Sequence, residues 1–184
     1  MTGRRLYVIT GPSGAGTAEI VEKVLADTDN VATVTPLTAR KMKEGELNGE
    51  GLIFYDLEEW NALKESGDLL ECTEMMGNDY GTSRRLVLKE FEKGNNVLIQ
   101  TEPERAAQIK RNMPEAVCIL VYPFDSDILK ARFAEKARSS FEVSVRTKVA
   151  LSQINSSKLF CDREVDSGSE DKACGEMISI INGN

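Results

Sequence analysis

Two kinds of hydrophobic pattern alternate along this chain of 184 residues. Short apolar runs with β-branched members predict buried strands at 5–10, 95–101 and 116–122. Apolar residues at helical spacing predict helices over 18–28, 57–67, 84–94, 104–113, 125–140, 143–157 and 171–181. A strand that leads into a turn is predicted over 68–83, and a short edge strand within 158–165.

Strands and helices that alternate in this way are typical of an α/β fold, in which helices cover both faces of a parallel sheet. The run at 116–122, AVCILVY, is the most apolar and predicts a central strand. The segment 31–56 is polar, contains glycine and a basic cluster, and predicts no helix or strand. The length suits one domain, 1–184, because no linker or repeat marks a second one.

A glycine-rich loop joins the first predicted strand to the first predicted helix. Its residues GPSGAGTA, 11–18, match both glycines of the phosphate-binding pattern G-x-x-x-x-G-K-[ST], but Thr17 and Ala18 occupy the last two positions. Backbone N–H groups at a helix N-terminus still form an anion site. The predicted phosphate-loop residues are Gly11, Ser13, Gly14, Gly16 and Thr17.

Four further stretches lie in register with this loop and resemble the guanylate kinase family. TARKMKEGELNGEGLIF (38–54) is similar to T-T-R-x-P-R-x-G-E-x-x-G-x-x-Y-x-F, and LLECTEMMGNDYGTS (69–83) to L-E-x-x-x-x-x-G-N-x-Y-G-T. VLIQTE (97–102) stands where the family has a strand ending D-x-D, and LKARFAEK (129–136) resembles L-x-x-R-L-x-x-R. The resemblance implies a P-loop NTPase type of fold with a small GMP-binding subdomain at about 36–92 and a lid at about 134–146.

The resemblance also implies a GMP site. Arg40 and Lys43 would hold the phosphate, and Tyr80 would donate its phenol to it. The Glu71 carboxylate would accept from the guanine N1–H and amino groups, an arrangement selective for guanine, while Thr82 would reach O6. The implied GMP-binding residues are Arg40, Lys43, Glu71, Tyr80, Thr82 and Glu102.

Three positions of this implied GMP site depart from the family pattern. Lys43 replaces an arginine, so a bidentate donor becomes a point charge. Leu52 replaces a tyrosine that donates to the phosphate, and Pro36 replaces a serine that reads the base. We therefore expect a recognisable site with weakened contacts.

The implied ATP site departs further. Thr17 replaces the loop lysine, Ala18 replaces the hydroxyl that binds magnesium, and Gln100 replaces an aspartate at the end of a strand. Phosphoryl transfer depends mainly on positioning and charge neutralisation, and one lost preorganised donor costs about 3–4 kcal/mol. Glu19 adds a negative charge beside the loop, and Lys23 lies too far along the helix to replace the lysine.

The resemblance implies catalytic roles in the lid for Arg132 and Arg146, with Lys136 in place of another lid arginine. Read without the resemblance, the same residues describe a solvated charged helix face. Cations that remain without the loop lysine could still bind a phosphorylated partner.

Composition excludes several other functions. The net charge of −7 disfavours nucleic acid as a partner, although a local cation cluster can still bind a small phosphate. The absence of histidine removes histidine bases and ligands, no metal site is predicted, and the four cysteines are expected to be structural. No signal-peptide pattern or membrane-length apolar run occurs, so we expect a cytoplasmic protein with no membrane partner.

Three functional hypotheses remain open. The first is a guanylate kinase-like protein with a decayed ATP site, catalytically weak or inactive, that binds GMP, a related nucleotide or a phosphorylated protein, and ATP only weakly. The second is an active ATP:GMP phosphotransferase in which Arg132 or Arg146 replaces the loop lysine; Mg²⁺ is expected as a cofactor only if the protein is catalytically active. The third is a kinase for another monophosphate.

Overall fold

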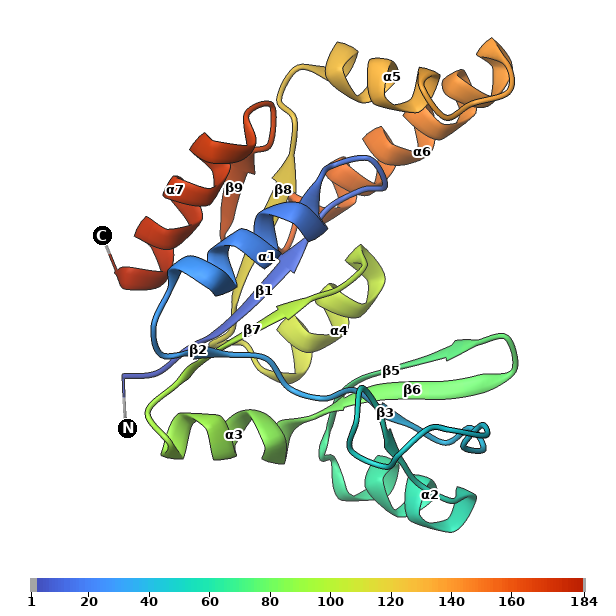
Figure 1. The fold of residues 1–184 in the computed structure, drawn as a ribbon, viewed down its shortest axis with the longest axis vertical. Coiled ribbons are helices and arrows are strands. Elements are labelled where there is room, and N and C mark those ends of the chain that lie inside the picture. Colours follow the sequence, from blue (N-terminus) through green and yellow to red (C-terminus); the bar gives the residue numbers. More distant parts are fainter. Residues whose placement is uncertain (1–2, 184) are drawn as a thin grey trace.

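The chain folds around a parallel β-sheet, described for residues 3–183 by a computed structural model (Figure 1). The sheet has the strand order β2-β7-β1-β8-β9, and each neighbouring pair is parallel. Its strands are β1 (Leu6–Thr10), β2 (Val31–Ala32), β7 (Asn96–Gln100), β8 (Val117–Tyr122) and β9 (Arg163–Asp166).

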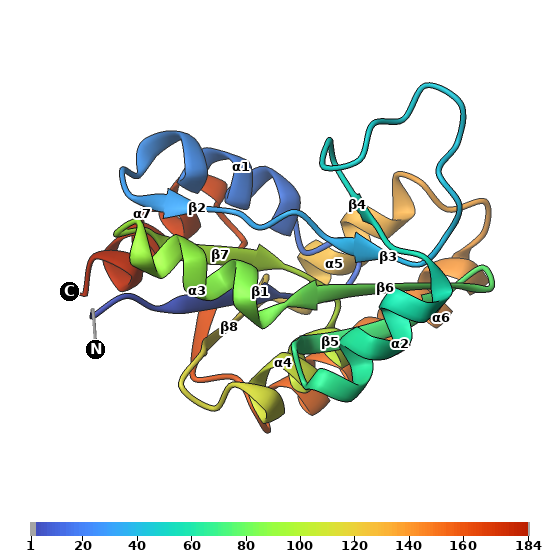
Figure 2. The same ribbon diagram turned by 90° about the horizontal axis from the view of Figure 1, so that it is seen from below.

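Helices cover both faces of this sheet (Figure 2). One face carries α1 (Thr17–Asp27) and α7 (Glu170–Asn182). The other face carries α3 (Arg84–Glu92), α4 (Pro103–Asn112), α5 (Ser126–Ala134) and α6 (Ser140–Ser157). The predicted fold class is thereby confirmed.

Alternation along β1 explains why both faces need a helical layer. Tyr7 and Ile9 point into the core beneath α1 and α7, whereas Leu6 and Val8 join the core beneath α3 and α4. All four side chains are buried. A strand that is apolar on both sides is stable only between two layers.

A second, mixed sheet lies beside the first and has the strand order β4-β3-β6-β5. It consists of β3 (Leu37–Thr38), β4 (Ile53–Phe54), β5 (Leu69–Met75) and β6 (Asn78–Ser83), and helix α2 (Leu57–Ser66) packs on it. Trp60 of α2 is fully buried, and its indole N–H donates to Asp79 of β6 at 2.7 Å. The β5–β6 hairpin projects on the same side of the molecule as α5 and α6 (Figure 1).

The prediction of a central strand at 116–122 is confirmed, because β8 is paired with β1 on one side and with β9 on the other. The structure corrects three details of the predicted elements. The helix expected over 125–140 ends at Ala134, and α6 begins after a new cap in which the Ser139 hydroxyl accepts from Glu142 N–H. The segment 68–83 forms two strands. Strands β2, β3 and β4 were not predicted, because two residues show no periodicity.

None of the helices within 3–183 is long and apolar enough to cross a membrane.

We expect Trp60→Ala to destabilise the protein by about 3–5 kcal/mol, because it opens a cavity in the core of the second sheet. Leu57→Ala is the matched control in the same helix, since Leu57 is 70% exposed; its effect should stay within about 0.5 kcal/mol. Urea unfolding followed by circular dichroism measures both values. Equal losses in the two variants would contradict the packing described for α2.

Candidate functional site

The glycine loop between β1 and α1 is held close to two neighbouring segments. A Cβ at Gly11 would lie 2.2 Å from the carbonyl oxygen of Val121, and a Cβ at Gly14 would lie 2.8 Å from the Phe133 ring. Gly14 also has a φ of 81°, which side chains rarely adopt. Both positions therefore require glycine.

Helix α1 presents its free N–H groups to ligands at this loop. Gly16 caps the helix with its backbone, and no side chain of the described residues accepts from the first turn. The first N–H groups of a helix have no partner within it, so they attract anions. The loop thus keeps the geometry of a phosphate site.

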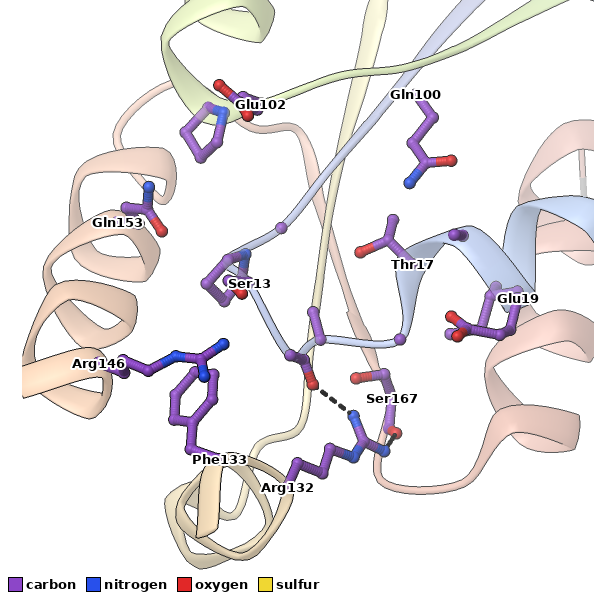
Figure 3. A pocket seen from close by; sticks show the side chains of 18 of the residues that line it. Ser13, Thr17, Glu19, Gln100, Glu102, Arg132, Phe133, Arg146, Gln153 and Ser167 are labelled. Carbon is purple, nitrogen blue, oxygen red and sulfur yellow. Dashed lines mark hydrogen bonds between the residues drawn. The ribbon is translucent and has the colours of Figure 1, made fainter. Parts of the chain in front are cut away.

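A cavity of about 1030 Å³ opens above the loop. Figure 3 shows it bounded by the loop, the end of β7, and helices α5 and α6. Four cationic side chains line it: Arg105, Arg132, Lys136 and Arg146. Its size suits a nucleotide-sized ligand.

Arg132 is bound to the protein's own backbone. It donates to the carbonyl oxygen of Gly14 at 2.9 Å and to that of Ser167 at 2.8 Å (Figure 3). These two hydrogen bonds connect α5 to the phosphate loop and to the turn between β9 and α7. A phosphate would have to share this guanidinium or displace it.

Within the described part of the chain, the opposite side of the loop carries no cationic side chain. Thr17 faces the Gln100 amide across the start of α1 (Figure 3), and Ala18 offers no polar atom. Lys23, well over one turn further along α1, forms ion pairs with Glu170 at 2.6 Å and Asp171 at 3.1 Å, which raise its pKa. No lysine therefore replaces the missing one from this helix.

The two positions where the resemblance implies magnesium ligands carry no anionic oxygen. Magnesium is usually held by one or two carboxylates together with substrate phosphates. Ala18 and Gln100 provide no carboxylate, whereas Glu19 and Glu102 line the cavity at other positions. Within 3–183, no three Cys, Asp or Glu side chains gather closely enough to hold a metal ion.

Arg146 and Lys136 line the cavity from the region predicted to form the lid. The Arg146 guanidinium carbon lies 4.7 Å from the centre of the Phe133 ring, a cation–π contact that fixes its position. Its ion pair with Glu142 is long, at 3.7 Å. Lys136 is exposed at the cavity edge.

The second sheet carries a basic site built on Arg40. The Arg40 guanidinium donates to both carboxylate oxygens of Glu46, at 2.7 and 2.5 Å, and lies over the Phe54 ring at 4.9 Å. The Lys43 backbone N–H also donates to Glu46, at 2.7 Å, whereas its side chain is exposed. Tyr80, on β6, lies beside Arg40 and helps to raise its pKa after the larger contribution of Glu46.

Glu71 lies on β5, where its side chain is fully buried. Arg105 of α4 donates to both of its oxygens, from Nε at 2.8 Å and from Nη2 at 2.7 Å. The Thr82 hydroxyl donates to Glu71 Oε1 at 2.7 Å. Strands β5 and β6 place Glu71 and Thr82 directly opposite each other.

Residues 3–183 match the family model described as Guanylate kinase. The chain belongs to the guanylate kinase family. The guanylate kinase of Prochlorococcus marinus (strain MIT 9312) is 31% identical over 179 residues, which cover 97% of each chain. That of Clostridioides difficile (strain 630) is 33% identical over 150 residues, which cover 81% of this chain and 73% of the relative.

A solved structure supports the same fold. The crystal structure of guanylate kinase from Anaplasma phagocytophilum has a TM-score of 0.66, 22% identity, and covers 99% of this chain and 86% of its own. A sugar kinase from Janibacter sp. HTCC2649 is more distant, with a TM-score of 0.51, 14% identity, and coverage of 97% and 95%.

The predicted site residues of this guanylate kinase family member fall into three groups. The loop residues line one cavity together with Arg132, Arg146 and Glu102. Arg40 and Lys43, in the segment between β3 and β4, share Glu46, and Tyr80 of β6 lies beside Arg40; Glu71 and Thr82 form a hydrogen-bonded pair on β5 and β6. Their roles in ligand binding stay predictions.

Sequence reasoning missed two residues that decide the charge of the site, Glu46 and Arg105. Glu46 belongs to a matched motif, and the sequence does not show that it is the partner of Arg40. Arg105 falls within a predicted helix, and the signal that could have found it is its place in the first turn after a strand end, from which an arginine can reach the neighbouring strand. Both pair with residues that the sequence singled out.

We expect Glu46 to ionise well below the usual range. The Arg40 hydrogen bonds, and then the Lys43 N–H, lower its pKa from 4.5 to about 2. Because the folded pKa is depressed, the stability that this pair contributes is complete above pH 4.5 and is lost as the pH falls toward 2. Carbon-13 NMR of the Glu46 carboxyl measures the titration.

Arg40→Met should return the Glu46 pKa toward its ordinary value, since the largest cause of the shift is removed. Arg111→Met is the control, because Arg111 is exposed on α4. A Glu46 midpoint that stays near 2 in Arg40→Met would contradict the assigned cause.

Proposed function

We propose that this guanylate kinase family member has kept an acceptor site for a guanine mononucleotide or a phosphorylated partner and has lost efficient phosphoryl transfer from ATP. The observation that carries the proposal is the state of the phosphate loop. Its geometry is intact, its lysine and hydroxyl positions are Thr17 and Ala18, and Arg132 beside it is bound to backbone carbonyls.

Electrostatics supports weak binding of a triphosphate. The helix N-terminus supplies roughly half an elementary charge, which a carboxylate in the first turn, Glu19, offsets. Without the lysine, one preorganised donor of about 3–4 kcal/mol is missing, which corresponds to two or three decades of rate. The absence of a hydroxyl at Ala18 and of a carboxylate at Gln100 further weakens the binding expected for Mg²⁺-ATP.

The acceptor side retains more of its chemistry. Arg40 is positioned by Glu46 and Phe54, and the Lys43 side chain is exposed. Glu71 and Thr82 keep a carboxylate and a hydroxyl at the positions that would read guanine, although both are bonded within the protein. A monophosphate or a phosphorylated side chain offers the same anionic group to Arg40 and Lys43.

One observation favours an active phosphotransferase as the alternative. Arg146 reaches the cavity from α6 and is held in place by Phe133 (Figure 3), so it could neutralise the transferred phosphoryl group in place of the loop lysine. GMP-dependent ADP production with Mg²⁺-ATP distinguishes the two functions. Rapid turnover by the native protein would establish the alternative.

Nucleotide affinity should be asymmetric: calorimetry should detect GMP and find Mg²⁺-ATP very weak. Arg40→Met should weaken GMP binding by about tenfold to a hundredfold, because hydrogen bonds to charged groups contribute ~1.5–3 kcal/mol. The affinity for Mg²⁺-ATP should stay unchanged. Tight Mg²⁺-ATP binding without GMP binding would contradict the proposal.

Restoring the loop should restore ATP binding. In Thr17→Lys with Ala18→Ser, the lysine would reach the β- and γ-phosphates and the serine would help to hold Mg²⁺. We expect Mg²⁺-ATP affinity to rise about tenfold or more, the value of one charge-assisted hydrogen bond. Turnover should recover only in part, because Gln100, Lys43 and Leu52 are unchanged.

Glu22→Gln is the matched control for this experiment. It raises the net charge by the same single unit on the exposed side of α1 and should leave ATP binding unchanged. If the double variant binds ATP no better than the control, the loss extends beyond the loop and the donor-site argument fails.

A further inference from the structure

The carboxylate assigned to guanine recognition is already occupied within the chain. The Glu71 side chain is 0% exposed, while the Arg105 side chain that covers it is 22% exposed and lines the cavity. Oε1 accepts from Arg105 Nη2 and from the Thr82 hydroxyl, and Oε2 accepts from Arg105 Nε. A ligand that enters the cavity meets the guanidinium first.

Arginine and guanine offer the same donors to a carboxylate. The N1–H and 2-amino groups of guanine share one carbon atom, so this edge of the base is itself a guanidine fragment. The Arg105 side chain presents Nε–H and Nη2–H in the same parallel geometry and fills both Glu71 oxygens. Oε1 already has two donors, so guanine cannot form its pair while Arg105 is bound.

We propose that Arg105 is an intramolecular competitor of guanine for Glu71 and that it determines base selectivity at this site. The inference rests on the proposed function in one respect, the assignment of Glu71 as the residue that reads guanine. When Arg105 is bound, ligands are held by their phosphate alone, at Arg40 and Lys43, and the base contributes no selectivity.

The surroundings allow the Arg105 side chain to release Glu71. It lies in the first turn of α4, three residues after Glu102, and these two charges attract each other. Residues three apart on a helix are neighbours, so Glu102 can hold the released guanidinium. The cavity beside it provides the space.

The effect of Arg105 on the apparent affinity for GMP can be estimated. Apparent affinity falls by the fraction of molecules in the binding-competent state. Minor states of folded proteins are populated at about 0.1–10%, so occupation of Glu71 by Arg105 weakens GMP binding by about tenfold or more. AMP gains nothing from a vacated Glu71, because adenine presents an acceptor, N1, to the carboxylate.

The experiment compares GMP and AMP binding by calorimetry in the native protein, Arg105→Gln and Arg105→Lys. Arg105→Gln should bind GMP at least about tenfold more tightly and AMP equally, so that selectivity rises by the same factor. Arg105→Lys keeps a charge beside Glu71 but donates at one point, and its affinity should be intermediate. Arg111→Gln, on the exposed face of the same helix, should match the native protein.

Removing one partner of a buried ion pair destabilises the fold, so the thermal melting of each variant is recorded. If Arg105→Gln does not fold, the GMP affinity of Arg105→Lys tests the proposal. Nitrogen-15 NMR of the native protein gives an independent measurement, because GMP should shift the Arg105 Nε–H signal and AMP should not. Unchanged or weaker GMP binding in a folded variant, or GMP binding without that shift, overturns the proposal.

Failure of the proposed function gives a different result. If neither GMP nor AMP binds to the native protein or to any folded variant, the acceptor site itself is refuted, and this inference with it. If all proteins bind GMP equally, the acceptor site stands and only the role of Arg105 is refuted.

Discussion

The site depends on the close contact between the phosphate loop and helix α5. Gly14 brings the loop backbone against Phe133, and Arg132 donates to the Gly14 carbonyl and to Ser167. The same ring positions Arg146 over the cavity. One contact therefore shapes the anion site, holds α5 against the loop and places Arg146 at the cavity, so the loop can retain its geometry with Thr17 at the lysine position.

The fold could be predicted because its signals are long or locally complete. Strands β1, β7 and β8 are continuous apolar runs, and the glycine loop follows β1 directly. The short strands β3 and β4 carry no such signal, because each exists only through pairing with a distant partner, such as Leu37 with Gly81 and Ile53. Tertiary pairing of this kind cannot be deduced from local periodicity.

The candidate site was predictable as a set of residues and not as a set of contacts. Motifs identified Arg40, Glu71 and Arg132, because the residue type and spacing are visible in the sequence. They could not show that Glu46, Arg105 and two carbonyl groups already bind them. The segment between β3 and β4 folds Glu46 back onto Arg40, α4 brings Arg105 to Glu71 of β5, and α5 brings Arg132 to the phosphate loop.

The internal partners of these arginines limit the affinity that a ligand can gain from them. Three of the arginines that could recognise a ligand are satisfied within the protein: Arg40 by Glu46, Arg105 by Glu71, and Arg132 by carbonyl oxygens. Burying an arginine requires such partners, since an unpaired charge in this environment costs several kcal/mol. A phosphate or a base gains only the difference between its own contact and the one that it replaces. Affinity in this family member is therefore set by the strength of the internal pairs as much as by the ligand.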